Sequence, residues 1–347
     1  MHFFSQKIIK LFILAILLVS PILVYGISQA ACLFLLIEQG SRAGAMGQAY
    51  VAQVDDGFAG WWNPGAMAFN RSNQLALMHS NWLGDVPGID DMYIEYISWN
   101  NYNEALLGNL GFHIIFLTYG EQERVNEQGQ PLGTFSSFEV AFAGTYAYQY
   151  SDNLGMGLTF KIIYSDLAPS GAPGNVQDVK GRGISFAFDF GAKQKNLGLS
   201  GLDAAVTLQN VGPDITYIDD EQHDPLPMNL RAGLSFRLID QELNKFTLNG
   251  DMSKELTRRD PLWKRWATSW KDDNIIYGMG AEYTYYNFLS LRMGYFYDDP
   301  GSITGMSFGA GIRYEFNHKY RAKFDFAMQP AGELTDYNKT FSLGVDF

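Results

Sequence analysis

The chain is organised around the stretch Ser41-Arg42-Ala43-Gly44-Ala45-Met46-Gly47-Gln48-Ala49-Tyr50-Val51-Ala52, followed by Asp55-Asp56-Gly57-Phe58-Ala59-Gly60-Trp61-Trp62-Asn63-Pro64-Gly65. Its first half is predicted to form a short helix of small residues with Ser41 as the N-cap. A helix with so little bulk can approach other backbone closely, as a plug inside a barrel must. Asp55-Asp56-Gly57 is predicted to stop this helix. Asn63-Pro64-Gly65 is predicted to make a second turn, because Pro64 fixes φ and Gly65 tolerates a positive φ. Taken alone, the stretch fits a small-residue helix in any protein core better than it fits a plug.

Composition favours a barrel in a membrane. The chain of 347 residues has a formal net charge of −12, which argues against nucleic acid as a partner. Aromatic residues make up 15% of the chain and glycines number 36, yet the mean hydropathy is only −0.11. A helical membrane protein would be more apolar. A transmembrane β-barrel reaches this average because apolar outward residues alternate with polar inward ones.

Residues 1–31 are predicted to be a secretory signal peptide. Lys7 and Lys10 precede an apolar run at 11–24, and residues 28–31 offer a small-residue cleavage site. A single membrane anchor is the alternative, but Pro21 interrupts the run. Cys32 is the only cysteine and would be lipidated in a lipoprotein, although Gln29 stands where such signals usually carry Leu. The predicted domains are the signal peptide at 1–31, a plug segment at 32–74 and a β-barrel at 75–347.

About fourteen stretches alternate with a period of two, which predicts β-strands with one apolar face. Phe186, Phe188 and Phe190 flank Asp189, and Phe324 and Phe326 flank Asp325, so the phenylalanines are expected to face lipid and the aspartates the lumen. The predicted strands span 75–82, 91–99, 107–119, 135–149, 154–165, 183–193, 202–210, 228–239, 244–253, 275–286, 289–298, 303–316, 319–328 and 338–347.

The connections between these strands alternate between long and short. Long ones are predicted at 120–134, 166–182, 211–227, 254–274 and 329–337, and short ones at 151–153, 240–243, 287–288 and 317–318. Outer-membrane barrels have long outer loops and short periplasmic turns, so long and short connections alternate along the chain. A soluble sandwich has no reason to keep this alternation. The last predicted strand ends at Phe347. A terminal phenylalanine on such a strand resembles the signal that the barrel-insertion machinery recognises.

Several of these segments resemble the PorV/PorQ family, relatives of the FadL-type outer-membrane barrels. The small-residue run at 41–52 and Trp62-Asn63-Pro64-Gly65-Ala66 are similar to the family's N-terminal signature, with Gly and Ala exchanged in the second part. Further resemblance lies at 120–135, 165–170, 183–191 and 209–231, and it is closer to PorV than to FadL. The resemblance implies an all-β fold: a transmembrane antiparallel barrel of about 14 strands in the outer membrane, with a short N-terminal helical plug.

In function, the resemblance implies a PorV-like role in type IX secretion. Such a barrel escorts secreted cargo from the outer-membrane translocon to the surface attachment complex by binding the cargo's C-terminal sorting domain. The alternative is a FadL-like channel for hydrophobic small molecules, gated by the plug, and a third hypothesis is a purely structural barrel. Expected partners are the cargo domains, translocon and attachment-complex proteins, and membrane lipid, with no nucleic acid.

The long loops carry apolar and basic residues that are predicted to bind cargo. They are Arg124, Leu132, Phe135, Leu167, Arg182, Ile215, Tyr217 and Ile218; the alternative is that they pack on each other and close the barrel top. The predicted plug residues are Ser41, Arg42, Gly44, Gly47, Asn63 and Pro64.

No catalytic, cofactor or metal site is predicted, and the chain is not expected to be an enzyme. The histidines are scattered, and carboxylate pairs such as Asp272-Asp273 lie beside turn residues without the spacing of a calcium loop. In the loop 254–274, Trp263, Trp266 and Trp270 fall on one face of a helix. They predict an interfacial helix with Trp at the headgroups, and an exposed docking surface is the alternative.

Overall fold

The computed structural model describes residues 30–84, 86, 91–126, 128–168, 181–217, 223–257, 260–271, 274–317, 319–333 and 335–347. The predicted signal peptide lies outside the described residues except for Ala30 and Ala31, and so does Ile218. Among the described residues, no helix is long and apolar enough to cross a membrane.

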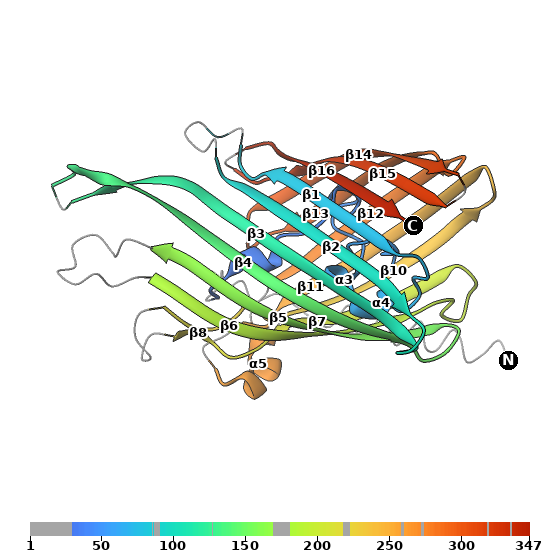
Figure 1. Cartoon of the computed structure of the whole chain (residues 1–347), viewed down its shortest axis with the longest axis horizontal. Coiled ribbons are helices and arrows are strands. Elements are labelled where there is room, and N and C mark those ends of the chain that lie inside the picture. The colour runs from blue at the N-terminus through green and yellow to red at the C-terminus, as the bar shows by residue number, and fades with distance from the viewer. Residues whose placement is uncertain are drawn as a thin grey trace.

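The described chain forms a closed antiparallel barrel of fourteen strands (Figure 1). Neighbouring strands pair in chain order, and β1 closes the barrel against β16. The barrel strands are β1 (Gln74–Asn81), β2 (Tyr93–Asn103), β3 (Gly108–Val125), β4 (Pro131–Gln149), β5 (Leu154–Ala168), β6 (Gly181–Gln194), β7 (Leu202–Val211), β10 (Asn229–Asp240), β11 (Asn244–Glu255), β12 (Ile275–Tyr285), β13 (Leu289–Asp298), β14 (Ile303–Phe316), β15 (Tyr320–Pro330) and β16 (Tyr337–Asp346). The predicted all-β barrel and its strand number are confirmed. Between β7 and β10, β8 (Ile215–Thr216) and β9 (His223–Asp224) form a separate two-stranded sheet.

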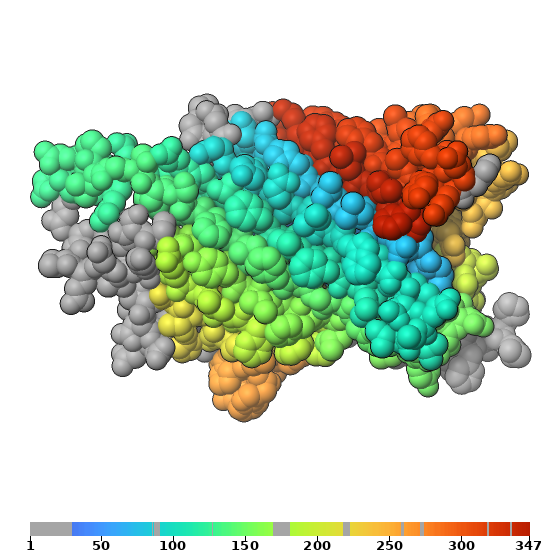
Figure 2. Space-filling view, in the orientation of Figure 1, coloured from blue at the N-terminus to red at the C-terminus, as the bar shows by residue number. Residues whose placement is uncertain are grey.

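The two ends of the barrel differ in their connections. One end, called the turn end, carries short connections such as 150–153 and 286–288 and the end of β16. The other, called the loop end, carries the connections 82–92, 212–228 and 256–274. The prediction of a loop at 120–134 is wrong for most of its length, because β3 and β4 stay paired out to Val125 and Pro131. This hairpin projects beyond the barrel at the left of Figures 1 and 2.

The two faces of each strand have different chemistry, as the period-two pattern predicted. Phe186, Phe190 and Phe324 are exposed on the outer wall, whereas Asp189 is buried in the lumen against Lys161, with 2.9 Å between its carboxylate and the ammonium group. Asp325 likewise accepts a hydrogen bond from the luminal Arg292. The predicted register is therefore confirmed for these strands.

The N-terminal residues 30–73, called the luminal segment, fill the barrel interior. They contain the short helices η1 (Leu33–Leu36), α2 (Ser41–Gly44), α3 (Ala59–Trp62) and α4 (Pro64–Met67). Their side chains join a core cluster with luminal residues of the wall. The main chain also approaches wall glycines: a Cβ at Gly278 would lie 2.2 Å from the Gly47 carbonyl oxygen. Small residues on both sides therefore let backbone pack on backbone.

Three local predictions for this segment are wrong. The N-cap of α2 is Gly40, with φ of 97°, and Ser41 instead hydrogen-bonds Ser342 of β16 through both its amide and its hydroxyl. The helix ends at Gly44, well before Asp55. Pro64 starts a helix rather than a turn, and the Asn63 side chain caps it by accepting a hydrogen bond from the Gly65 amide.

Candidate functional site

The predicted partner-binding residues are spread over the loop end. Leu132 lies on the projecting hairpin with 53% of its surface exposed, and Leu167 is exposed at the end of β5. Arg124 and Phe135 are half-buried on the same hairpin. Arg182, at the start of β6, donates a hydrogen bond from its Nε to the Asp166 carboxylate at 2.7 Å. Leu132 and Leu167 are thus the exposed apolar members of this group, and they lie on different strands.

Ile215 and Tyr217 turn inward, which corrects their assignment to an exposed surface. Ile215 is fully buried, and Tyr217 is half-buried and donates a hydrogen bond to the Ser165 hydroxyl at 3.1 Å. After Val211 the chain bends over the luminal face of β6, because apolar residues there escape water by joining the core cluster. The burial of these two residues is consistent with the alternative that the loop residues pack on each other, and it leaves Ile215 inaccessible to a partner.

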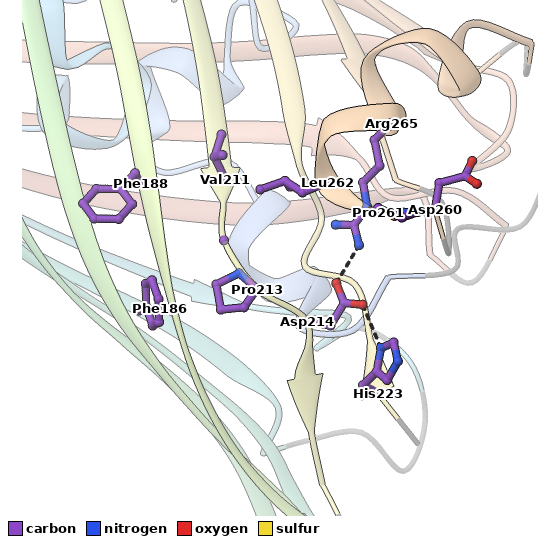
Figure 3. A pocket seen from close by; sticks show the side chains of 11 residues that line it. Phe186, Phe188, Val211, Pro213, Asp214, His223, Asp260, Pro261, Leu262 and Arg265 are labelled. Carbon is purple, nitrogen blue, oxygen red and sulfur yellow. Dashed lines mark hydrogen bonds and ion pairs between the residues drawn. The ribbon is translucent and has the colours of Figure 1, made fainter. Parts of the chain in front are cut away.

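A largely apolar groove of about 610 Å³ opens beside them at the loop end (Figure 3). The lining residues, which define the loop-end groove, are Phe186, Phe188, Val211, Gly212, Pro213, Asp214, His223, Asp260, Pro261, Leu262 and Arg265. Phe186 and Phe188 belong to the outer face of β6, and Leu262 and Arg265 to helix α5 (Leu262–Thr268). The groove therefore lies between the barrel wall and a helix of the β11–β12 connection.

Asp214 holds α5 in place beside the groove. Its carboxylate accepts a hydrogen bond from Arg265 Nη2 at 2.6 Å and lies 2.8 Å from His223 Nδ1 (Figure 3). The Arg265 side chain is only 3% exposed. Asp214 therefore engages both Arg265 and His223, and apolar side chains supply most of the rest of the groove surface.

Helix α5 and the 3-10 helix η2 (Ser269–Lys271) that follows it carry three exposed tryptophans. Trp263, Trp266 and Trp270 are all exposed, whereas Arg265 and Ser269 are buried on the opposite side. In Figures 1 and 2 the helix protrudes from the wall at the lower edge. The predicted helix is present for Trp263 and Trp266, whereas Trp270 lies in η2 with the Lys254 ammonium 5.9 Å from its ring centre. An exposed Trp face on a membrane barrel fits both an interfacial anchor and a docking surface.

In the lumen, Arg42 attaches the luminal segment to the wall. Its Nε and Nη2 donate to the two Glu282 carboxylate oxygens at 2.8 and 2.7 Å, and Nη1 donates to Tyr50 and Asp55. Burial alone would lower the pKa of Arg42, but the surrounding carboxylates outweigh it and hold that pKa well above its usual range. Asp251 of β11 adds a second attachment by accepting hydrogen bonds from the Tyr50 and Val51 amides.

The other predicted plug residues act mainly through close packing. A Cβ at Gly44 or Gly47 would collide with Gln329 or with the Tyr295 carbonyl oxygen. Asn63 donates to the Val51 and Ala192 carbonyl oxygens, and Pro64 packs against Gly157 and Gly191. The segment is thus tied to opposite sides of the barrel.

The turn end holds a cavity of different character. It has a volume of about 340 Å³ and is lined by Arg42, Gln53, Val54, Asp55, Ala66, Phe69, Asn70, Lys193, Lys195, Asp203, Ser235, Arg237, Asp240, Lys245, Thr247, Glu282, Thr284 and Arg313. Charged side chains of both signs predominate. Such a lining favours water and ions over an apolar ligand.

Comparison with known proteins places this architecture in a family. The family model of the type IX secretion system protein PorV matches residues 26–261, which is more than half of the chain. This chain belongs to the PorV family. A comparison with curated protein sequences found no match.

Solved structures similar to this PorV-family chain are channels of the same fold. The toluene transporter TodX of Pseudomonas putida is 13% identical, with a TM-score of 0.55 over 88% of this chain and 96% of that one. The CymD monoaromatic hydrocarbon channel is 12% identical, with a TM-score of 0.56 over 88% and 96% of the two chains. At this identity the likeness shows the fold alone. Together with the family match, it makes this chain an outer-membrane β-barrel.

Within the described residues of this PorV-family barrel, no group of three or more His, Cys, Asp or Glu side chains could hold a metal ion. The acidic pairs at 219–221 and 272–273 lie outside the described residues. Cys32 is buried in the lumen, where burial and then the charge of Glu139 raise the pKa of its thiol. A lipid on this thiol would require the luminal segment to leave its place.

The sequence prediction missed the residues that build the loop-end groove. Asp214 and Arg265 are separated by 51 positions, and no local pattern links them. Phe186 and Phe188 were predicted to face lipid, and the groove lies on that outer face. The one available signal was the Trp spacing in 254–274, which predicted α5 but not what it packs against.

Proposed function

We propose that this protein is an escort barrel of type IX secretion. It binds the C-terminal sorting domain of secreted cargo at its loop end, between release from the outer-membrane translocon and transfer to the surface attachment complex. Membership of the PorV family supports the secretion system. The proposed site of cargo binding is inferred from where the exposed apolar surfaces of this chain lie.

The observation that carries the proposal is the contrast between the two sides of the luminal segment. The loop-end groove is open and largely apolar, and Leu132 and Leu167 stand exposed at the same end. The lumen below is packed with the luminal segment, whose Ala43, Ala45 and Met46 are fully buried. Exposed apolar surface outside a filled barrel suits protein docking better than passage.

A channel for hydrophobic small molecules is the second candidate, and the similarity to the toluene transporter TodX and the monoaromatic hydrocarbon channel CymD favours it. To serve as a channel, the barrel would have to release the luminal segment from Glu282 and Asp251. An apolar permeant would then meet the charged cavity at the turn end. Both features make the escort the better-supported function.

The test is binding of a purified cargo sorting domain to the purified barrel in lipid nanodiscs. We expect Leu132→Ser combined with Leu167→Ser to weaken binding, because it removes apolar contact area at the loop end. The matched control is Leu197→Ser with Leu199→Ser, two leucines of similar exposure at the turn end. Heat-modifiable migration on gels verifies that each variant is folded.

Two outcomes would contradict the escort function. One is a wild-type barrel that does not bind the sorting domain at all. The other is an equal loss of affinity in the loop-end and turn-end double variants, which would mean that binding does not depend on the loop end.

A further inference from the structure

We propose that the barrel wall is open between β6 and β7 at the loop end, and that the free edge of β6 there pairs with an extended strand of the cargo sorting domain. The inference rests on the proposed function and deepens it, because it names the contact that holds the cargo. Three features of the described residues carry it: the pairing of β6, the direction of its main chain and the groove beside it.

Strand β6 is paired on both sides for only half of its length. Towards β5 the ladder runs from Gln194 to Gly181. Towards β7 it ends where Phe188 pairs with Val211, after an irregularity between Phe188 and Phe190. Among the described residues, no strand continues the ladder beside 181–187. Gly212 approaches the main chain at Phe186, so the part of this edge without a described neighbour is 181–185, roughly 17 Å at about 3.3 Å per residue.

The free edge directs main-chain groups into the gap. A Cβ on Gly212, which follows Val211, would lie only 2.0 Å from the Phe186 carbonyl oxygen, so this carbonyl points away from β5. Because main-chain groups of an antiparallel strand alternate between its two sides, Ile184 points the same way. No described residue bonds the main-chain groups of Ile184 on that side. With respect to the described part of the chain, the edge at Ile184 is therefore an unfilled hydrogen-bonding template.

The nearby sheet of β8 and β9 does not fill the gap. A Cβ on Gly183, a residue of the luminal face, would meet Ile215 at 2.7 Å, and the Ser185 hydroxyl donates to the Pro213 carbonyl oxygen. Both contacts are made through the luminal side of β6. The chain at 213–216 therefore lies under the strand and leaves its edge open.

The loop-end groove runs beside this edge and matches the needs of an added strand. Phe186, Leu262 and Pro213 offer apolar contact, while Arg265 and His223 are engaged by Asp214. Ile184, two residues before Phe186 on the outer face of β6, is 70% exposed. Main-chain hydrogen bonds combined with apolar pockets are what strand addition uses, and this mode tolerates variation in partner sequence.

The environment argues for a peptide as the occupant. An open strand edge in a membrane barrel is costly, because lipid tails cannot pair with its N–H and C=O groups. A small apolar ligand could fill the groove but would leave the edge unpaired. A strand from a β-rich sorting domain would both pair with the edge and fill the groove with its side chains. The free edge ends near Arg182, and Leu167 lies on the other side of β6, at the end of β5; both belong to the proposed cargo surface.

The test is disulfide scanning in a Cys32→Ser background. Ile184→Cys places a thiol at the free edge, and Met293→Cys places one at an exposed outer position on β13, which is paired on both sides. Single cysteines are moved along each strand of a purified cargo sorting domain, and cross-linking is measured under mild oxidation. We expect cross-links to Ile184→Cys at every second position of one cargo segment, because side chains alternate along a strand. Met293→Cys should give none.

Other outcomes overturn the inference in distinguishable ways. Cross-links without a period of two, or binding with no cross-link at Ile184→Cys, would leave the escort function standing but refute strand addition. Cross-linking between two barrels, or to a cysteine placed in residues 218–222 of the same chain, would show that another occupant covers the edge. Absence of any binding to the wild type would refute the escort function itself.

A backbone substitution gives a second measurement. Ile184→Pro removes the N–H at the free edge and is tolerated there, because proline is compatible with edge strands. Ile184→Val is the matched control and keeps that N–H. We expect Ile184→Pro to weaken binding of the sorting domain about tenfold, the size of one good main-chain hydrogen bond. Equal affinities of the two folded variants would overturn strand addition.

Discussion

Arg42 joins the luminal segment to a network of buried charges in the barrel wall. It pairs with Glu282, which also accepts from Arg292 at 2.6 Å, and Arg292 in turn donates to Asp325. These charges come from α2, β12, β13 and β15. Because they are desolvated together, removing one partner leaves the others incompletely compensated.

We predict that Arg42→Met lowers the free energy of unfolding by about 3 kcal/mol or more, because it leaves Glu282 buried with only one of its two cationic partners. Equilibrium unfolding in urea with detergent micelles measures this. Glu282→Gln is the matching change on the wall, and the double variant should lose less than the sum of the two singles. Additive losses would show that the pair is not coupled.

Single residues were also where sequence reasoning failed most. Ser41 has the chemistry of an N-cap, yet its hydroxyl is used by Ser342, about 300 positions later in the chain. Ile215 was predicted to lie in an exposed loop, but the bend of the chain after Val211 buries it. Both outcomes depend on contacts between segments distant in the sequence, and local secondary-structure propensity carries no information about such contacts.

At the scale of elements, the period-two pattern predicted nearly all barrel strands to within a few residues. The main error was the β3–β4 hairpin. Gly120-Glu121-Gln122-Glu123 is too polar to face lipid, and the apolar alternation therefore ends there. Backbone pairing continues regardless, with Glu123 opposite Thr134, because a hairpin outside the membrane needs no apolar face. Polarity thus marks where the membrane ends rather than where the strand ends.

We predict that Phe324→Arg costs roughly 2–4 kcal/mol of folding free energy, because it puts a charge on the lipid side near the middle of β15. Phe324→Leu is the control at the same site. Folding titrations into liposomes give both values. If the charged and the apolar substitution cost the same, the outer wall at this strand does not face hydrocarbon.

At the scale of the whole molecule, the barrel separates three environments. The outer wall is apolar, the turn-end cavity is charged, and the loop end carries the groove and the exposed leucines. The alternation of long and short connections predicted this polarity from sequence. The open seam between β6 and β7 could not be predicted, because both strands have the alternation of fully paired ones. Only their register shows that β7 stops short of the β6 end.

The proposed function requires the loop end to face the outside of the cell, and this orientation can be tested directly. In a Cys32→Ser background, Leu132→Cys marks the loop end and Leu199→Cys the turn end, and both parent side chains are about half exposed. A maleimide on a polymer too large to cross the outer membrane should label Leu132→Cys in intact cells. It should label Leu199→Cys only after permeabilisation, because short turns face the periplasm.

The wild-type protein is the folded control, since burial of the Cys32 thiol and its raised pKa should keep it unlabelled. Labelling of Leu199→Cys in intact cells would reverse the barrel and place the groove in the periplasm, where it could not hand cargo to a surface complex.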